Sequence, residues 1–340
     1  MKRIFSTLCL AAMVAFVATS CNKDDQNQSE NQTAEYTISL GETHGFQPGP
    51  TTIEGSKAYL DPSNFQFRWN AGDEVSIYNL FANETQSTCT NYTTFEGGGT
   101  AIARFSGPAI LTKGEYGYFV FYNPNNSERT SGSNREVFHV NATQNYVADC
   151  GMDPTAMAMA CVASGEAGQG VTHFQMEHIF GFLDVAIAGM KEGDKVNQIV
   201  VKDKTFNITG DMSLLMHKVN PNTLTALMNQ CESTNGGDAY KQALAEYIGV
   251  LGYETDNKGN TITLNCGGKE LNHLAWNYFI IPVRPGAFYK GMEIDVYFEG
   301  GTVSHAHYES TGTNMNHLMK PGYFRNFYFL SNSDQLYFEN

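Results

Sequence analysis

The sequence predicts an all-β protein built from two Greek-key β-sandwiches in tandem. Apolar and polar residues alternate along many short segments, as they do in strands that are buried on one face. These segments are bounded by Gly, Pro or Asn and recur along most of the chain. One segment, Asp238–Leu251, instead has apolar residues at helical spacing behind an Asp that can cap the first turn. We therefore expect a single short helix, in the second sandwich.

The chain begins with a segment typical of an export signal. Lys2 and Arg3 precede an apolar run, Ile4–Val17, which is too short to span a bilayer. Small residues then lead to Cys21, an arrangement that resembles the lipobox of bacterial lipoproteins, where the cysteine carries acyl chains. We expect residues 1–20 to be a lipoprotein signal peptide and Cys21 to be the lipid anchor. An ordinary secretory signal is the alternative.

The segment after the cysteine is polar and lacks aromatic residues, so we expect residues 21–35 to be a disordered tether. Its first residues include Lys23, Asp24 and Asp25. They resemble the acidic sorting signal that sends lipoproteins of gut and oral Gram-negative anaerobes to the outer face of the outer membrane. We therefore predict a surface-exposed lipoprotein of the outer membrane.

The formal net charge of the whole chain is −14, and loss of the basic signal peptide would make it more negative. This charge argues against nucleic acid as a partner and against an electrostatic membrane patch. The residues after the tether suffice for two domains of ordinary size. Because Ser164–Gly170 reads as a linker, we expect an N-terminal sandwich at 36–165 and a C-terminal sandwich at 166–340.

The first sandwich is expected to start with the strand Tyr36–Leu40, in which Tyr36, Ile38 and Leu40 alternate with polar residues. Gly41–Ser56 is then a long exposed loop. The clearest alternation follows in Phe65–Leu80, which we interpret as a hairpin that turns at Ala71-Gly72-Asp73 and buries Trp69. The further strands expected here are Tyr92–Phe95, Ile102–Phe105, Tyr116–Tyr122 and Glu136–Val147.

The second sandwich is expected to start with Val171–Ile187, where a change of parity at Gly181-Phe182 predicts a bulge or bend. The further strands expected are Val196–Lys202, Phe206–Ile208, Met212–His217, Thr261–Cys266, Trp276–Val283, Met292–Glu299, Val303–Tyr308 and Tyr323–Leu330.

The cysteines after the anchor do not form a recognisable site. They are Cys89, Cys150, Cys161, Cys231 and Cys266, and their spacing is not that of a zinc site. Mostly buried free thiols are favoured over one disulfide, and the sequence does not indicate a pairing.

The sequence contains no motif of a serine hydrolase, a zinc protease or a nucleotide-binding loop. We therefore predict a protein that is not an enzyme, with no catalytic residues, no cofactor and no metal. His305 and His307 would share one strand face, but a third metal ligand is not evident. Glu293, Asp295 and Glu299 favour a solvated strand face over catalytic carboxylates because they alternate with apolar residues. His178 is interpreted as a core or rim histidine that holds a backbone carbonyl, and Gly97–Gly99 as a turn.

Several of these features resemble, in their order and spacing, the fimbrillin-like family of surface lipoproteins, which includes the major and minor (Mfa-like) fimbrial subunits of gut and oral Gram-negative anaerobes. In the first half they are Trp69, Gly72-Asp73, Val75–Tyr78, Phe105-Ser106-Gly107 and Tyr116–Pro124. In the second half they are Phe174–His178, Leu183–Ile187, Ile208-Thr209-Gly210, Tyr278–Pro282 and Pro321-Gly322-Tyr323. The resemblance covers nearly the whole exported chain.

The resemblance implies two transthyretin-like sandwiches and a structural or adhesive role in fimbriae. In the family, a trypsin-like protease removes the first strand and a strand from a neighbouring subunit takes its place. Carried over to this chain, Tyr36, Ile38 and Leu40 mark the exchanged strand. Lys57 is the candidate cleavage site, because the first loop contains no Arg.

The expected partners are other fimbrial subunits, the outer membrane and a receptor on a host or bacterial surface. The short tail Ser331–Asn340 offers little sequence for a donor strand, so a tip or accessory position fits the chain as well as a stalk position. The alternative is a monomeric surface lipoprotein that binds glycan or host protein. A surface hydrolase is disfavoured because no catalytic motif is present.

Overall fold

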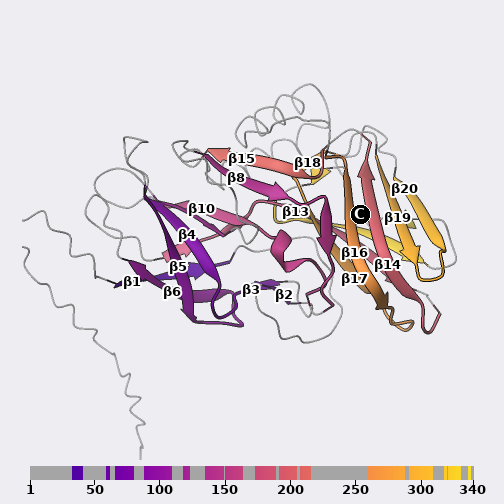
Figure 1. Ribbon diagram of the computed structural model, residues 1–340, viewed down its shortest axis with the longest axis horizontal. Helices are drawn as coiled ribbons and strands as arrows, with labels where there is room; N and C mark the ends of the chain where they lie inside the picture. The colour runs from indigo at the N-terminus through magenta and orange to yellow at the C-terminus, as the bar shows by residue number, and fades with distance from the viewer. Residues whose placement is uncertain are drawn as a thin grey trace, which may run out of the picture. The chain divides into compact units, whose positions relative to one another are not determined.

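β-Strands form nearly all of the regular structure in the computed structural model (Figure 1). The structure describes residues 33–40, 59–61, 66–79, 88–108, 118–122, 135–148, 150–163, 173–188, 191–204, 207–215, 259–287, 291–308, 318–319, 321–330 and 336–337. The predicted all-β class is confirmed. The predicted helix at Asp238–Leu251 lies outside the described residues, and the transthyretin-like topology stays a prediction. Among the described residues, no helix has the length and apolar character needed to cross a bilayer.

The largest sheet contains eight strands in the order β11-β1-β6-β5-β4-β7-β10-β12. They are β1 (Thr33–Ser39), β4 (Glu74–Asn79), β5 (Thr88–Glu96), β6 (Ile102–Pro108), β7 (Tyr118–Tyr122), β10 (Met159–Ala163), β11 (His173–Gln175) and β12 (Glu177–His178). The two terminal strands of this order, β11 and β12, are separated in sequence by Met176 alone. The eight-stranded sheet therefore closes on itself through the continuous segment His173–His178.

Two further large sheets contain most of the later strands, in the orders β17-β13-β22-β23 and β20-β19-β14-β16-β9. Their strands are β9 (Thr143–Asn145), β13 (Gly181–Ala188), β14 (Lys195–Asp203), β16 (Thr261–Glu270), β17 (Asn277–Val283), β19 (Met292–Phe298), β20 (Val303–Tyr308), β22 (Phe324–Leu330) and β23 (Leu336–Tyr337).

Three short pairs of strands complete the described part of the chain. They are β2 (Tyr59–Asp61) with β3 (Gln66–Arg68), β8 (Arg135–Val140) with β15 (Gly210–Leu215), and β18 (Gly286–Ala287) with β21 (Leu318–Met319). A 3-10 helix, η2 (Pro154–Ala156), is capped by Asp153, whose side chain accepts a hydrogen bond from the backbone N–H of Thr155.

Two hydrophobic clusters form the core, and β7 and β13 contribute to both. Tyr118, Val120 and Tyr122 of β7 belong to the cluster of the eight-stranded sheet, while Phe119 and Phe121 belong to the cluster built on the later strands. In the same way, β13 places Phe182 in the cluster of the eight-stranded sheet. Its residues of the opposite face, Leu183, Val185 and Ile187, belong to the cluster built on the later strands. Strands that are buried on both faces read as continuous apolar runs, as the sequence of β7 does.

Strand pairing crosses the predicted domain boundary at 165/166 in both directions. The strands β8 and β9 pair with β15 and β16, which lie later in the sequence, whereas β11 and β12 join the eight-stranded sheet. Thr33–Asn340 forms one compact unit. The division into sandwiches at 36–165 and 166–340 stays a prediction from sequence, because the rhythm of strands carries no information about their partners.

The predicted hairpin in Phe65–Leu80 is wrong, although the turn and the burial of Trp69 are confirmed. The strand β3 pairs with β2, while β4 pairs with β5 and β7. Trp69 instead pairs with the turn between β5 and β6: its backbone N–H donates to the Thr100 carbonyl at 2.9 Å, and its carbonyl accepts from the Gly99 N–H at 2.7 Å. The Trp69 segment thus satisfies its backbone groups away from β4.

Other element boundaries differ from the predictions in smaller ways. The first strand begins at Thr33, so the last three residues of the predicted tether at 21–35 are in β1. The strand β10 was not predicted, and the predicted linker Ser164–Gly170 lies outside the described residues. The predicted strand Val171–Ile187 is interrupted before Gly181, where β13 begins, in agreement with the predicted bend.

Candidate functional site at the first strand

The first strand lies inside the eight-stranded sheet, paired with β6 along its whole length and with β11 over Thr37–Ser39. It pairs antiparallel with β6, with Tyr36 opposite Phe105, and parallel with β11, with Ile38 opposite Phe174. Past the end of β1, the Leu40 N–H donates to the Ala101 carbonyl at 2.8 Å. Without β1, the facing edges of β6 and β11 would both lose their backbone partners.

The inward face of β1 carries the three apolar residues that the alternation indicates. Tyr36, Ile38 and Leu40 have exposed fractions of 5%, 0% and 4%. The Tyr36 ring meets the Tyr92 ring edge to face, with centroids 5.0 Å apart. Gly107 makes room for Tyr92, because a Cβ atom there would lie 2.5 Å from Cδ1 of the Tyr92 ring. The slot for β1 is therefore shaped by residues of β5 and β6.

The buried side chain of Trp69 and the exposed side chain of Gln175 hold the backbone of β1 and of the residue after it. The indole Nε1 of Trp69 donates to the Ile38 carbonyl at 3.1 Å, and Nε2 of Gln175 donates to the Leu40 carbonyl at 3.0 Å. Both contacts are made to main-chain oxygens, so they would accept any residue at those positions of the strand.

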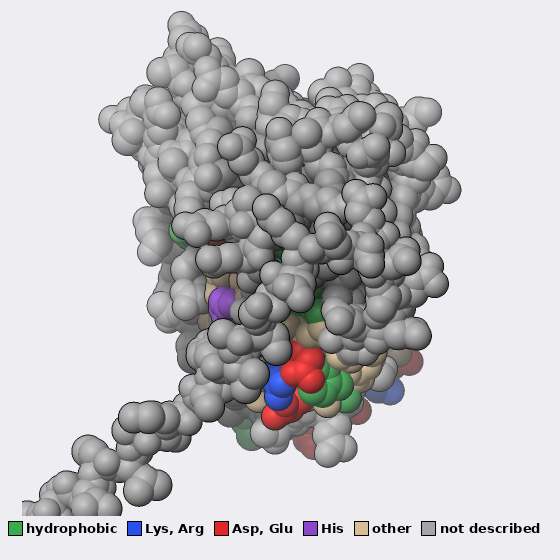
Figure 2. All heavy atoms as spheres, turned by 90° about the vertical axis from the view of Figure 1, so that its left-hand side faces the viewer, with side chains coloured by type: hydrophobic (Ala, Val, Ile, Leu, Met, Phe, Trp, Pro, Cys, Tyr) green, Lys and Arg blue, Asp and Glu red, His purple; other side chains and the backbone are tan. Residues whose placement is uncertain are grey.

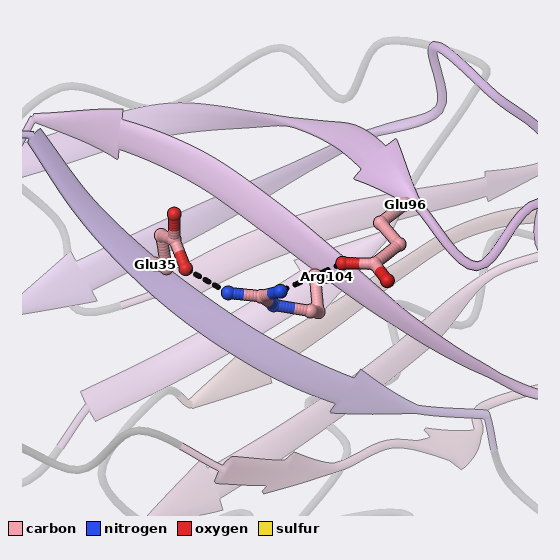
Figure 3. Close-up of polar contacts among 3 residues, drawn as sticks. All are labelled: Glu35, Glu96 and Arg104. Atoms are coloured by element: carbon pink, nitrogen blue, oxygen red, sulfur yellow. Dashed lines mark hydrogen bonds and ion pairs between the residues drawn. The ribbon is translucent and has the colours of Figure 1, made fainter.

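The outward face of β1 carries an ion pair that joins three strands (Figure 3). Arg104 of β6 lies between Glu35 of β1 and Glu96 of β5; its Nη1 donates to Oε2 of Glu96 at 2.7 Å, and its Nη2 pairs with Oε2 of Glu35. The guanidinium also lies over the Phe95 ring, 5.1 Å from its centroid. The hydrogen bond with Glu96 and the charge of Glu35 raise the pKa of Arg104.

Exposed apolar side chains accompany this ion pair. Phe95 of β5 and Ile102 of β6 have exposed fractions of 47% and 55%. Figure 2, which views the side of the molecule where β1, β5 and β6 lie in Figure 1, shows basic, acidic and hydrophobic side chains next to one another. The outer surface of the first strand and its neighbours is thus charged and apolar at once.

The other predicted site residues lie outside the described residues. They are the lipid anchor Cys21, the sorting signal Lys23, Asp24 and Asp25, and the cleavage site Lys57. Anchoring, sorting and cleavage therefore stay predictions.

Three of the later cysteines are described, and they are free thiols in the core. Cys150, Cys161 and Cys266 are buried. Burial raises the pKa of both Cys161 and Cys266 to about 12, which keeps these thiols protonated and unreactive. Cys231 lies outside the described residues, and so does the side chain of Cys89, so their pairing stays open.

The acidic and histidine residues of β19 and β20 lie on a solvated strand face, as the sequence suggests. Nδ1 of His305 pairs with Oδ1 of Asp295 at 2.6 Å, and Oε1 of Glu293 lies 3.7 Å from Nζ of Lys204. Glu299 pairs with Lys195. Within the described ranges, no group of three or more His, Cys, Asp or Glu residues is placed to hold a metal ion.

His178 and the glycines between β5 and β6 also have the structural roles that the sequence suggests. His178 is buried, and its ring centroid lies 4.5 Å from that of Phe67 and 5.3 Å from that of Phe182. Gly97 and Gly99 have φ values of 93° and 80°, which place them in the left-handed region that favours glycine in turns.

A loop before β17 carries exposed apolar residues that the sequence does not single out. Trp276 is predicted to start a strand, but it directly precedes β17. It is 38% exposed, and its ring meets the Tyr328 ring edge to face, with centroids 5.2 Å apart. Leu274 is 83% exposed. The side chain of Asn277 fixes this loop: it accepts from the Asn272 N–H at 2.8 Å and donates to the Ala275 carbonyl at 3.2 Å.

Neither a family model nor a curated protein matches the sequence. Solved structures match it at low identity. A candidate cell adhesion protein of Bacteroides ovatus is 10% identical, with a TM-score of 0.48, over 90% of this chain and 97% of its own. One of Bacteroides uniformis is 13% identical, with a TM-score of 0.45, over 79% and 90%. A fimbrial assembly protein of Parabacteroides distasonis is 8% identical, with a TM-score of 0.37, over 90% and 94%. The structural neighbours of this chain are therefore candidate cell adhesion proteins and a fimbrial assembly protein.

Proposed function

We propose that this chain is a non-enzymatic structural or adhesive subunit of a fimbria-like surface structure, exported as a lipoprotein and assembled by exchange of β1. The observation that supports this most is the position of β1 within the closed sheet. It is an N-terminal strand with a partner on each edge, and residues 40–58 separate it from the next described strand, β2. The resemblance of the sequence to fimbrillin-like proteins supports the same function.

Loss of β1 would create a slot that only another extended strand can fill. The slot would expose the core residues that now cover Tyr36, Ile38 and Leu40. Full burial of one large apolar side chain contributes about 1.5–3 kcal/mol to the free energy of unfolding. It would also leave the edges of β6 and β11 unpaired. An apolar groove and an open sheet edge are the two features that strand addition requires.

A cut at Lys57 would have two effects at once. Both Cys21 and β1 lie on the N-terminal side of this residue. Cleavage would therefore separate the body of the protein from its lipid anchor and would also allow β1 to leave. In this way one proteolytic step would couple release from the membrane to readiness for assembly.

To test strand exchange, a soluble Cys21→Ala chain would carry a site for a specific protease directly after Lys57. Cut and uncut protein would be compared in size distribution and thermal stability, with and without a peptide of residues 33–42. We expect cut protein to lose β1 slowly, to self-associate, and to regain stability when it captures the peptide.

The matched control is the same peptide with Ile38→Asp, which should not be captured because it would bury an unpaired charge. Exchange at this strand would be excluded if the cut protein stays monomeric, keeps its melting temperature and binds neither peptide.

The anchor has a separate test in cells. Replacing Cys21 by Ala should release the protein from membranes, because an acidic chain has no electrostatic attraction for anionic lipids. Replacing Asp24 and Asp25 by Ala should keep acyl labelling but reduce surface display. Unchanged membrane fractionation of the Cys21→Ala protein would contradict the lipoprotein proposal.

A second candidate function, binding of glycan or host protein by a monomeric surface lipoprotein, is favoured by the loop that presents Trp276. A half-exposed indole on a loop fixed by hydrogen bonds can stack on a sugar ring or enter a protein pocket with little loss of entropy. A glycan array would compare wild type, Trp276→Ala and the control Phe95→Ala. Loss of binding in Trp276→Ala alone, with no fimbriae in electron micrographs of expressing cells, would favour this function.

A further inference from the structure

Apolar alternation alone does not specify which strand can enter the β1 slot. The same alternation occurs in other strands of the chain, for example in β19, where buried and half-buried residues alternate. The contacts that Trp69 and Gln175 make with β1 go to main-chain oxygens and are independent of sequence. Selection of a particular strand therefore needs a contact with one of its side chains.

The ion pair with Arg104 is such a contact. Glu35 is the one charged residue in the sequence of β1, Thr33–Ser39. Its partner Arg104 is held by Glu96 and by the Phe95 ring, and both residues belong to β5, which stays in the sheet when β1 leaves. The guanidinium would thus remain close to its present position, with one edge turned to the empty slot.

We propose that Arg104 selects the incoming strand by pairing with a carboxylate in the position of Glu35. This inference rests on the proposed strand exchange and deepens it. The preferred partner is a strand that runs antiparallel to β6 and has an acidic residue directly before three alternating apolar residues. A strand with a basic residue in that position places two cations together and is rejected.

The test uses full-length soluble protein cut after Lys57, mixed with excess peptide at once, so that the peptide can take the place of β1 as it leaves. Labelled peptides of residues 33–42 would carry Glu, Gln or Lys at position 35, and binding would be measured at low salt. For the unaltered protein we expect Glu35→Gln to weaken binding by about two- to fivefold, the range of an exposed ion pair. Glu35→Lys should weaken binding further.

Charge reversal in the protein gives the decisive result. Arg104→Glu should reverse the order of affinities of the three peptides. The Glu35→Lys peptide should then bind best, because its cation lies between carboxylates at positions 96 and 104. The matched control is Lys195→Glu, which makes the same charge change on β14, next to Glu299. It should keep the original order of the three peptides.

The outcomes separate this inference from the function on which it rests. If the three peptides bind equally well to both the unaltered and the Arg104→Glu protein, strand exchange stands and selection by Arg104 is overturned. If no peptide displaces β1 in either protein, both are overturned. A double-mutant cycle in uncut protein, with Glu35→Gln and Arg104→Gln, should show a coupling in melting temperature, and additive effects would count against the ion pair as a specific contact.

Discussion

Asp184 is a buried acidic residue whose surroundings do not favour its charged form. It lies in β13, opposite Ile280 of β17 and Asn326 of β22. It is 1% exposed, and neither carboxylate oxygen has a hydrogen-bond partner within the part of the chain that the structure describes. Burial raises its pKa well above the ordinary value, so that the neutral acid is the favoured form. An uncompensated buried group of this kind lowers the stability of the fold.

This environment predicts a pH-dependent gain from Asp184→Asn. Above the unfolded pKa, near 3.9, and up to the raised folded pKa, the folded wild type keeps a proton that the unfolded chain has released. Stability of the wild type therefore falls as pH rises through this window, and the neutral amide removes that loss. Urea unfolding should give nearly equal stabilities for both proteins at about pH 3 and a more stable variant at about pH 7.

The control for this prediction is Asp211→Asn, because Asp211 is exposed and pairs with His139. The difference in stability between the Asp211→Asn protein and wild type should not grow in the same direction with pH. An Asp184→Asn protein whose advantage stays constant across the pH range would show that the pKa of the Asp184 carboxyl is not raised in the fold.

At the scale of elements, strand positions follow from the sequence more closely than strand partners do. The bounds of β20 were predicted as they are found, because alternation and flanking turns are local signals. The partners of β1 were not, since β11 lies far along the chain and its parallel pairing leaves no local pattern.

The same limit explains which part of the site was predicted. Alternation indicated Tyr36, Ile38 and Leu40, but the pairing of Glu35 with Arg104 depends on the register between β1 and β6. The exposure of Trp276 depends on a network that Asn277 makes with its loop. Such contacts can be known only when the neighbouring strands are placed.

The pairing of β1 with β11 predicts that a disulfide between Thr37→Cys and His173→Cys should lock the first strand. The two residues are directly opposite, at the strand separation that suits a disulfide. After cleavage at Lys57, the oxidised variant should remain monomeric and stable, and reduction should return it to the behaviour of cut wild type. Single Thr37→Cys protein is the control. Equal association of oxidised and reduced double variants would show that β1 need not leave.

At the scale of the whole molecule, the net charge of −14 opposes contact between copies. We therefore expect added salt to speed the association of cut protein, because screening weakens the repulsion between like-charged bodies. The same salt should reduce the preference for Glu over Lys at position 35 of a captured peptide, since it also screens Arg104. Light scattering and peptide binding at low and high salt would measure the two trends. Association that slows with salt would contradict the first.

The closure of the eight-stranded sheet also has a mechanical consequence. In a polymer joined through the β1 slot, tension between neighbouring subunits would pass along the strand that fills it. Because that strand lies between β6 and β11, a pull along its axis must shear both ladders together, whereas a strand added at an open edge resists through one ladder only. A subunit that accepts its neighbour inside a closed sheet would thus bear a higher load before the joint slips.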